Sequence, residues 1–221
     1  KIPVAGGPAV IICDASEARG GTWGPDGTIL FEPYWRDPIF KVAASGGIPE
    51  PVTTLDEAKS ETTHRWPWFL PDGRHFLYLA GSHTATLEST LNTIYVGSLD
   101  SGERKALINA RSNAISAAGY LLYLKDSFLV AHRFDAAKLA LIGDPITLAE
   151  NVEYVPGYFR GAFSASDGGT LIFARAGHQR KEQIAMYDRS GKMLFKVGDP
   201  AELHSIRFSP DGQKLAASIG D

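Results

Sequence analysis

Short apolar triplets recur along the chain, and each follows a turn-forming stretch that contains glycine. The triplets occupy residues 29–31, 76–78, 121–123, 171–173 and 215–217, and the turns occupy residues 25–27, 71–73, 118–119, 166–169 and 210–212. The turn glycines Gly27, Gly73, Gly119, Gly169 and Gly212 are 46, 46, 50 and 43 residues apart. A period of this length is typical of propellers and other repeat architectures. The repeat period therefore predicts the fold class.

The repeated unit predicts a β-hairpin. Proline presets the backbone at the first central position of such a turn, aspartate accepts backbone hydrogen bonds, and glycine supplies the left-handed conformation. A second turn follows in each of the first four repeats, for example at residues 45–47 and 100–102, and a strand-like stretch precedes it. Each repeat thus has about four short strands, which is one propeller blade. The third repeat has Ala118 and Gly119 in place of Pro-Asp-Gly, so we expect its blade to be irregular.

The two ends of the chain carry complementary halves of a repeat. Residues 2–12 match the outer half and residues 203–219 the inner half. We therefore predict one all-β domain over residues 1–221, a β-propeller with four four-stranded blades and a composite blade from both termini. In that blade, strands at 9–13 and 213–219 would pair. The alternative is a fragment of a larger propeller, whose open edges would favour pairing with another copy.

The aromatic residues that precede the turns give a second structural prediction. Trp23, Phe69 and Phe208 hold equivalent places in their repeats, next to an apolar triplet. Large aromatic side chains at a recurring position are typical of a core between packed sheets. We expect these three to be buried between blades and the turns beside them to be exposed.

Charge and cysteine content exclude several classes of function. The chain has 22 basic and 25 acidic side chains, which gives a net charge of −3, and no basic block suggests nucleic acid or an anionic membrane as a partner. The single cysteine, Cys13, excludes an internal disulfide and a cysteine-based metal cluster. No apolar run approaches the roughly 18–20 residues of a membrane-spanning helix.

Two stretches carry a resemblance to a known family. The turn Trp-Gly-Pro-Asp-Gly at residues 23–27 with the apolar triplet after it resembles the TolB-like, WD-repeat-like propellers. The stretch over residues 63–78, from Thr-His-Arg-Trp-Pro to Phe-Leu-Tyr, is similar to the propellers fused to bacterial serine/threonine kinase domains. The resemblance covers nearly the whole chain, and it implies a β-propeller in a periplasmic or other extracytoplasmic location.

Catalytic motifs are missing from the sequence. A serine hydrolase of the α/β type needs Gly-x-Ser-x-Gly, and a kinase needs a glycine-rich loop and a catalytic-loop signature; the sequence contains none of these. The histidines lack the spacing of zinc ligands, and the turn aspartates are too far apart to converge on calcium. We therefore expect no enzyme activity, no cofactor and no metal site.

A recurring basic position is the strongest indication of a binding site. Arg19, Arg65 and Arg111 precede their turn glycines by eight residues, Arg160 by nine and His204 by eight. The first strand of a blade lies nearest the propeller axis, so these five side chains are expected to form a ring at one rim of the channel. Guanidinium groups suit carboxylates, phosphates or acidic residues of a partner. The alternative is pairing with acidic residues close in the sequence.

A second candidate surface is the loop that holds Trp35 and Arg36, where an aromatic side chain beside an arginine often marks a protein contact. Simple packing of the loop is the alternative. Together these features predict a non-catalytic sensor or scaffold that binds a protein or a small anionic ligand. By resemblance it would be the extracytoplasmic part of a bacterial signalling kinase. The alternative function is the substrate-gating propeller of a prolyl-oligopeptidase-like hydrolase whose catalytic domain lies elsewhere.

Overall fold

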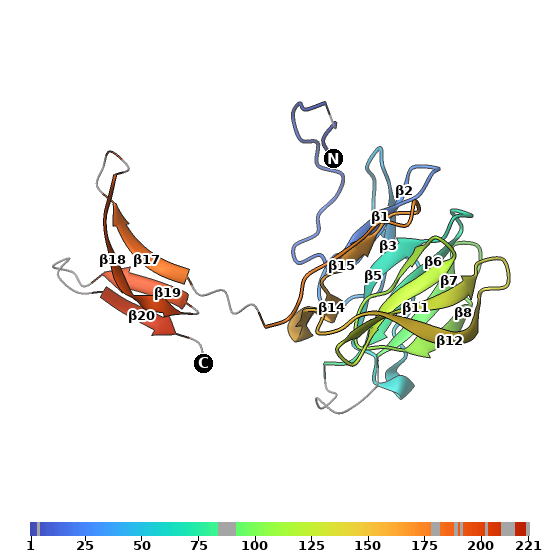
Figure 1. The fold of residues 1–221 in the computed structure, drawn as a ribbon. Helices are drawn as coiled ribbons and strands as arrows, with labels where there is room; N and C mark the ends of the chain where they lie inside the picture. The colour runs from blue at the N-terminus through green and yellow to red at the C-terminus, as the bar shows by residue number, and fades with distance from the viewer. Residues whose placement is uncertain are drawn as a thin grey trace. The chain divides into compact units, whose positions relative to one another are not determined.

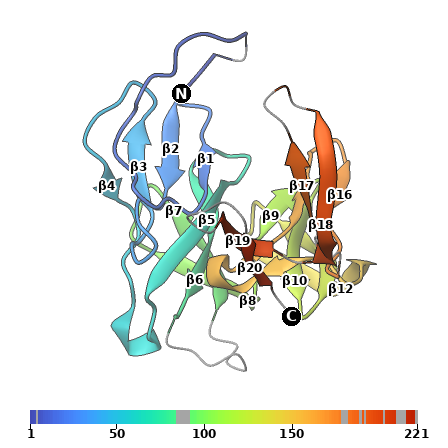
Figure 2. The same cartoon turned by 90° about the vertical axis from the view of Figure 1, so that its left-hand side faces the viewer.

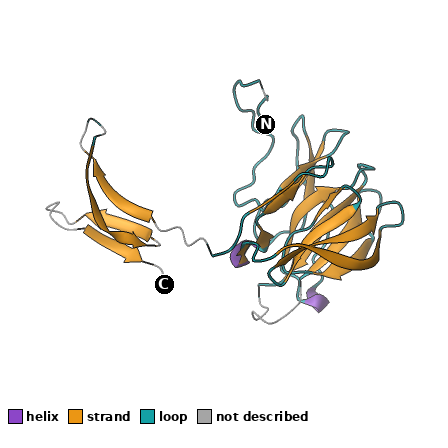
Figure 3. Cartoon of the chain, viewed as in Figure 1, coloured by secondary structure: helices purple, strands orange, loops and turns teal. Residues whose placement is uncertain are grey.

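The computed structural model describes residues 1–3, 5–83, 92–177, 182–187, 190, 192–201, 203–208 and 215–219. The chain consists of two compact units, Lys1–Ala176 and Gly177–Asp221. Strands and loops make up almost all of both units, and the described helices are two single 3-10 turns, Glu57–Lys59 (η1) and Pro156–Tyr158 (η2) (Figure 3). The all-β prediction is confirmed. That both units belong to one domain stays a prediction.

The first three repeats each form a four-stranded antiparallel sheet with its strands in chain order, as a propeller blade requires (Figure 1). The first sheet holds β1 (Gly21–Trp23), β2 (Thr28–Phe31), β3 (Phe40–Ala43) and β4 (Glu50–Pro51). The second holds β5 (Thr63–Phe69), β6 (His75–Gly81), β7 (Thr93–Ser98) and β8 (Arg104–Asn109). The third holds β9 (Ile115–Ala117), β10 (Tyr120–Lys125), β11 (Phe128–Asp135) and β12 (Ala140–Ala149).

Shorter two-stranded sheets follow. The first unit adds β13 (Tyr154–Val155) paired with β14 (Arg160–Gly161), and β15 (Phe163–Ala165) paired with β16 (Leu171–Phe173). The second unit pairs β17 (Glu182–Tyr187) with β18 (Met193–Ala201), and β19 (Leu203–Phe208) with β20 (Leu215–Ile219). Four-stranded blades are therefore confirmed for the first three repeats, and a four-stranded fourth blade stays a prediction.

The repeated turns have the predicted geometry. Gly27, Gly73, Gly119 and Gly169 all have positive φ, between 66° and 89°. In the first turn Asp26 accepts a hydrogen bond from the Thr28 backbone at 2.9 Å, which confirms its turn-capping role. The turn at 210–212 lies outside the described residues, although β19 and β20 on either side of it pair as a hairpin.

The third repeat is more regular than its turn sequence predicts. Ala118 and Gly119 both have positive φ, 50° and 80°, as a two-residue hairpin turn needs. The pairing of β9 with β10 runs without a register shift through this turn. Irregularity occurs instead between β11 and β12, where the register shifts twice. A two-residue turn can thus replace Pro-Asp-Gly, because the second residue is still glycine.

The core lies between successive sheets. Leu30 and Ile39 of the first repeat pack with Phe76, Tyr78 and Tyr95 of the second. A similar cluster joins the second and third sheets, and another joins the third sheet to β15 through Phe163. Figure 2 shows the sheets of this unit around its centre, each turning one edge strand inward. Face-to-face packing of this kind buries both faces of the middle sheets and leaves their inner edges at the centre.

Burial of the aromatic residues differs from the prediction. Phe69 is half-buried and packs against the cluster between the first two sheets. Trp23 is 54% exposed, so its predicted burial is wrong, and the side chain of Phe208 lies outside the described residues. The physical reason is that this side chain packs toward the preceding sheet. Phe69 lies against Gly24 of the preceding sheet, whereas no described sheet of the first unit precedes that of Trp23.

The predicted strand at residues 9–13 is also wrong. This segment has no strand structure, Val10 is 51% exposed and Ile11 is 86% exposed. Its backbone bonds instead to the chain start, where the Val10 amide donates to the carbonyl of Lys1 at 2.8 Å. Among the described strands, β20 pairs with β19 alone. None of the helices in the described ranges has the length and apolar character needed to cross a membrane.

Candidate functional site

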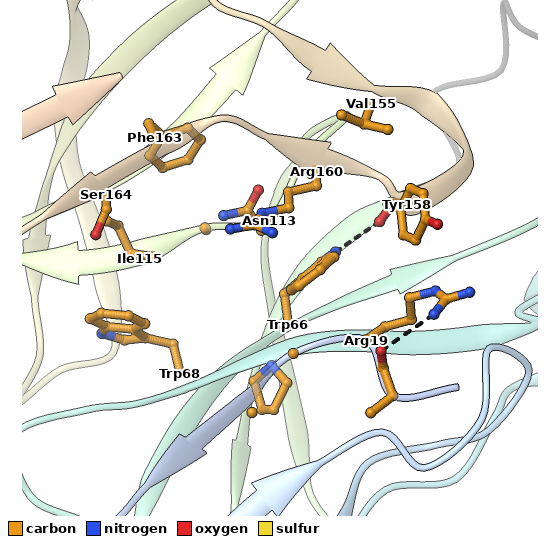
Figure 4. A pocket seen from close by; sticks show the side chains of 15 residues that line it. Arg19, Trp66, Trp68, Asn113, Ile115, Val155, Tyr158, Arg160, Phe163 and Ser164 are labelled. Carbon is orange, nitrogen blue, oxygen red and sulfur yellow. Dashed lines mark hydrogen bonds between the residues drawn. The ribbon is translucent and has the colours of Figure 1, made fainter. Parts of the chain in front are cut away.

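A cleft of about 730 Å³ opens at the centre of the first unit, where the first strands of successive repeats meet (Figure 4). Its walls come from residues 18–21 at the start of β1, residues 66–68 of β5, residues 113–115 at the start of β9, and residues 155–164 around β14 and β15. A volume of this size is within the usual range for small-ligand sites, roughly 300–1,000 Å³. The convergence of first strands at one opening is what the repeat pattern predicts.

Trp66 has an unusual backbone conformation in the wall of this cleft. Its φ is +54°, and the pairing of β5 with β6 is interrupted between Arg65 and Trp68. The indole Nε1 donates to the carbonyl of Tyr158 at 2.8 Å, and the Trp66 amide donates to the carbonyl of Arg19 at 3.2 Å. Non-glycine residues with positive φ occur mainly where the surrounding structure holds them, often at functional sites.

Gly20 lies directly against the Trp66 ring. A Cβ atom at Gly20 would overlap Cε3 of that ring, and Gly20 itself has a φ of +84°. On the other side of the cleft, the guanidinium of Arg160 lies 5.1 Å from the Trp66 ring centroid. The Trp66 ring therefore has one hydrogen bond, one close contact with the Gly20 backbone and one cation–π contact, which together hold a flat aromatic surface in the site.

The two arginines that line the cleft differ in how their charges are used. Arg160 is exposed, and no residue within the described ranges forms an ion pair with it. Arg19 lies over the Tyr158 ring at 4.7 Å, and its Nη2 is 3.8 Å from the Glu17 carboxylate. Its Nη1 donates to the Glu17 carbonyl at 3.2 Å. Arg160 thus supplies the most available positive charge, and Arg19 a partly compensated one.

Arg65 occupies the equivalent repeat position but is only 1% exposed. Its Nε donates to Thr63 Oγ1 at 2.9 Å, its Nη1 to the Gly157 carbonyl at 3.0 Å and its Nη2 to the Trp35 carbonyl at 2.9 Å. A fourth bond joins Nη2 to Nε2 of His83 at 2.7 Å. These contacts bury the guanidinium and use most of its donors inside the fold.

Glu32 lies beside Arg65, fully buried. Its Oε1 accepts from Thr63 Oγ1 at 2.5 Å and is 3.7 Å from Arg65 Nε. Among the described residues, its Oε2 has no hydrogen-bond partner. Burial raises the pKa of Glu32 to about 8, although the Thr63 hydrogen bond and the charge of Arg65 oppose that rise. The carboxyl group is therefore mostly protonated at neutral pH.

His83 completes this buried cluster. Burial and the charge of Arg65 lower the pKa of His83 to about 4. A neutral ring fits the contacts, since Nε2 accepts from Arg65 while Nδ1 is 2.7 Å from Thr62 Oγ1. The ring of His83 also packs edge-on against Trp35, with centroids 4.9 Å apart.

The other predicted residues are not among those that line the cleft. Arg111 is exposed and lies 5.0 Å from the Tyr154 ring. Trp35 is half-buried in the loop between β2 and β3, and the exposed Arg36 stacks on it at 4.3 Å. The side chain of His204 on β19 lies outside the described residues. The structure therefore brings Arg19, Arg65, Arg111 and Arg160 to residues 154–160, and of these Arg19 and Arg160 line the cleft. That the basic positions bind a ligand stays a prediction.

Several lining residues were not predicted. Asn113 is 7% exposed; its amide oxygen accepts from the Gly161 backbone at 2.9 Å, which leaves the amide nitrogen as a donor at the cleft wall. A signal for it exists in the sequence. Gly21, Pro67, Asn113 and Phe163 each precede their turn glycine by six residues, and all four line the cleft. In the first three repeats this position is two beyond the basic one, and alternate residues of an extended chain face the same side, so the sequence could have indicated it.

Comparison with known proteins supports the fold only. Regucalcin from Agrobacterium tumefaciens, described as a calcium-binding protein, is similar with a TM-score of 0.50 and 13% identity over 94% of this chain and 83% of its own. A luciferin-regenerating enzyme gives 0.49 and 12% over 93% and 84%, and a streptogramin B lyase gives 0.44 and 15% over 91% and 62%. No family model matches the chain, and no curated protein matches it. The chain has the fold of a β-propeller protein.

Metal ligation finds no support in the described part of the chain. No group of three or more histidine, cysteine, aspartate or glutamate side chains is arranged there to hold an ion. Glu32 is buried and accepts a hydrogen bond from Thr63. Asp72, another turn aspartate, accepts from the backbone amides of Arg74 and His75, both at 2.9 Å. These acidic groups serve local structure.

Proposed function

We propose that the chain is a non-catalytic binding module whose central cleft holds a small anionic ligand. The observation that carries this proposal is Arg160, whose exposed guanidinium lies over the Trp66 ring in a cleft of about 730 Å³ and has no ion-pair partner among the described residues. Charge-assisted hydrogen bonds from a guanidinium to a carboxylate or phosphate are among the stronger polar contacts in proteins. Arg19 adds a second positive charge across the opening.

The described lining of the cleft offers no base for a hydroxyl nucleophile. Among its described lining residues, Ser164 is the only hydroxyl nucleophile besides the phenol of Tyr158, and no histidine or carboxylate lines the cleft to act as its base. General-base catalysis requires such a group within hydrogen-bond reach. We therefore infer that ligand binding is the output of the site, as in a sensor or scaffold.

The wider role that we propose is that of a bacterial signalling module. The support is the resemblance of residues 23–27 and 63–78 to TolB-like propellers of the kind fused to serine/threonine kinases. In such a protein, occupation of the cleft outside the cytoplasm would be reported to a kinase domain.

The test is a titration by calorimetry of the 221-residue chain with acetate, indole-3-acetate and inorganic phosphate at low and high salt. At least one anion should bind, more weakly as salt rises, because exposed charge pairs are screened. Arg160→Gln should remove that binding, and Arg133→Gln, an exposed arginine of β11 outside the cleft, should leave it unchanged. If no anion binds, or if both variants behave alike, the proposal is wrong.

A separate measurement addresses catalysis. A panel of ester, lactone and peptide substrates should give no turnover above that of a heat-treated sample. Turnover that disappears in Ser164→Ala would show that the site is catalytic.

A further inference from the structure

From the distribution of polarity around the cleft, we infer that its ligand is an aromatic or similarly flat apolar molecule carrying one carboxylate. This inference rests on the proposed function, and it goes further because it names the chemical class of the anion. Three features of the lining support it: its division into a cationic and an apolar side, the fixed orientation of Arg160, and the small number of available charges.

The two sides of the cleft differ in chemistry. One side carries Arg19, Asn113 and Arg160 beside the phenol of Tyr158, and the other carries Trp68, Ile115 and Phe163 with the hydroxyl of Ser164 as its polar group (Figure 4). Apolar groups therefore face one end of a bound molecule while hydrogen-bond donors face its other end. A ligand that is polar throughout would leave the apolar side in contact with water or with unpaired polar atoms, which is unfavourable. The arrangement fits a molecule with a charged end and an apolar end.

The apolar side is rigid. Phe163 is 8% exposed and belongs to the core between the third sheet and β15, and Trp68 packs against two core clusters. Ile115 is 6% exposed in the same cluster as Phe163. Aromatic side chains fixed in this way favour offset or edge-to-face packing with another ring. A flat ring fills such a wall better than a branched aliphatic group.

Arg160 is oriented by Trp66. Its guanidinium lies 5.1 Å from the ring centroid of Trp66, and that ring is held by the hydrogen bond to the Tyr158 carbonyl. Contact with one aromatic ring leaves N–H groups of the guanidinium available, and a guanidinium matches the two oxygens of a carboxylate. Arg160 is therefore suited to a planar, two-oxygen anion.

The charge count favours a monoanion. Arg160 has no ion-pair partner in the described part of the chain, whereas Arg19 already faces Glu17 at 3.8 Å. No lysine is among the described residues that line the cleft, and Asn113 adds a neutral donor. A phosphate with nearly two charges and three terminal oxygens would require more cationic partners than this lining offers. A carboxylate is matched by one free guanidinium.

The experiment compares four probes on the 221-residue chain by calorimetry: indole-3-acetate, acetate, indole and inorganic phosphate. Indole-3-acetate should bind at least about tenfold more tightly than acetate, because the ring buries additional apolar area. Indole-3-acetate should also bind at least about tenfold more tightly than phosphate and than indole. Arg160→Gln should lower the affinity for indole-3-acetate about tenfold and leave the affinity for indole unchanged. Arg133→Gln should change neither affinity.

A second variant tests the apolar side. Ser164 is exposed beside Phe163. Ser164→Asp should therefore weaken the binding of indole-3-acetate, because it places a carboxylate at the apolar end. Ser164→Asn, whose new side chain has the size of aspartate without its charge, should have little effect. If acetate or phosphate binds as tightly as indole-3-acetate and depends on Arg160, the ligand class is wrong and the proposed function stands. If indole alone binds as tightly, the carboxylate assignment is wrong. If no probe binds, both proposals fail.

Discussion

Arg65 and Arg160 occupy corresponding places in their repeats, yet their surroundings are opposite. Arg65 is 1% exposed, with its donors directed at the carbonyls of Trp35 and Gly157 and at His83. Arg160 is exposed in the cleft, where its described contact is the Trp66 ring. Arginines eight and nine residues before their turn glycines thus have different surroundings, one inside the fold and the other exposed at the cleft.

Loops outside the repeat pattern produce this difference. The turn at 33–36 and the single helical turn η2 both cover Arg65, and Phe159 lies 4.9 Å from its guanidinium. Nothing comparable in the described ranges covers Arg160. The repeat therefore fixes which side chains lie near the centre of the unit, and the connecting loops fix which of them meet solvent. Variants of the two regions should separate these roles.

Replacing Arg65 should have the largest effect on stability. Arg65→Ala should lower the free energy of unfolding by about 3–5 kcal/mol, because removing one partner of a buried polar cluster leaves the others without compensation. Urea denaturation measures the loss. The double variant Arg65→Met with Glu32→Gln should lose less than Arg65→Ala, since it removes the paired group as well and retains volume. Equal losses in the two proteins would show that the cluster contributes only by packing.

Glu32 should make stability fall as pH rises above neutrality. Its pKa is raised from 4.5 to about 8 in the folded protein, so the folded state holds a proton that the unfolded state has released. Stability from this group is complete below pH 4.5 and is lost as pH rises to 8. His83, lowered from 6.5 to about 4, has the opposite effect between pH 4 and 6.5, so the effect of Glu32 is clearest from pH 6.5 to 8.

In that window the free energy of unfolding should fall by about 2 kcal/mol, at roughly 1.4 kcal/mol per pH unit for one proton. Thermal or urea unfolding across pH 6.5 to 8 measures the slope, and Glu32→Gln should flatten it. A stability that rises over this range in the unmodified chain would contradict the protonation state assigned to Glu32.

Arg160 should contribute least to the fold. Arg160→Gln should change the free energy of unfolding by no more than about 0.5 kcal/mol, because exposed substitutions away from buried contacts are usually near neutral. The measurement is the same urea titration used for Arg65→Ala. A loss above about 2 kcal/mol would mean that the cation–π contact with Trp66 holds the fold, and the contrast between the two arginines would disappear.

The hairpins were predictable because their information is local. Glycine with positive φ and an aspartate that bonds the next strand, as at Asp26 and Gly27, are properties of five or six neighbouring residues. The equal spacing of the first three turns, 46 residues each time, then predicted the first three sheets. The basic positions Arg19 and Arg160 at the central cleft followed from the same register.

Burial was less predictable because it depends on residues far away in the sequence. Arg65 is covered by Gly157, 92 residues later, and Trp23 is exposed although Phe69 at the same repeat position is half-buried. The left-handed conformation of Trp66 also has no local signature, since it is held by Tyr158 and Arg19. Periodicity identifies equivalent positions, but their surroundings differ from one repeat to the next.

The central claim is that the cleft between Arg160 and the aromatic wall is the ligand site. The most direct measurement is X-ray diffraction from crystals of the 221-residue chain soaked in indole-3-acetate. We predict electron density for the carboxylate of indole-3-acetate at the Arg160 guanidinium and for its ring against Trp68 and Phe163. Density at another surface with this cleft empty, at a concentration well above the dissociation constant measured in solution, would contradict it.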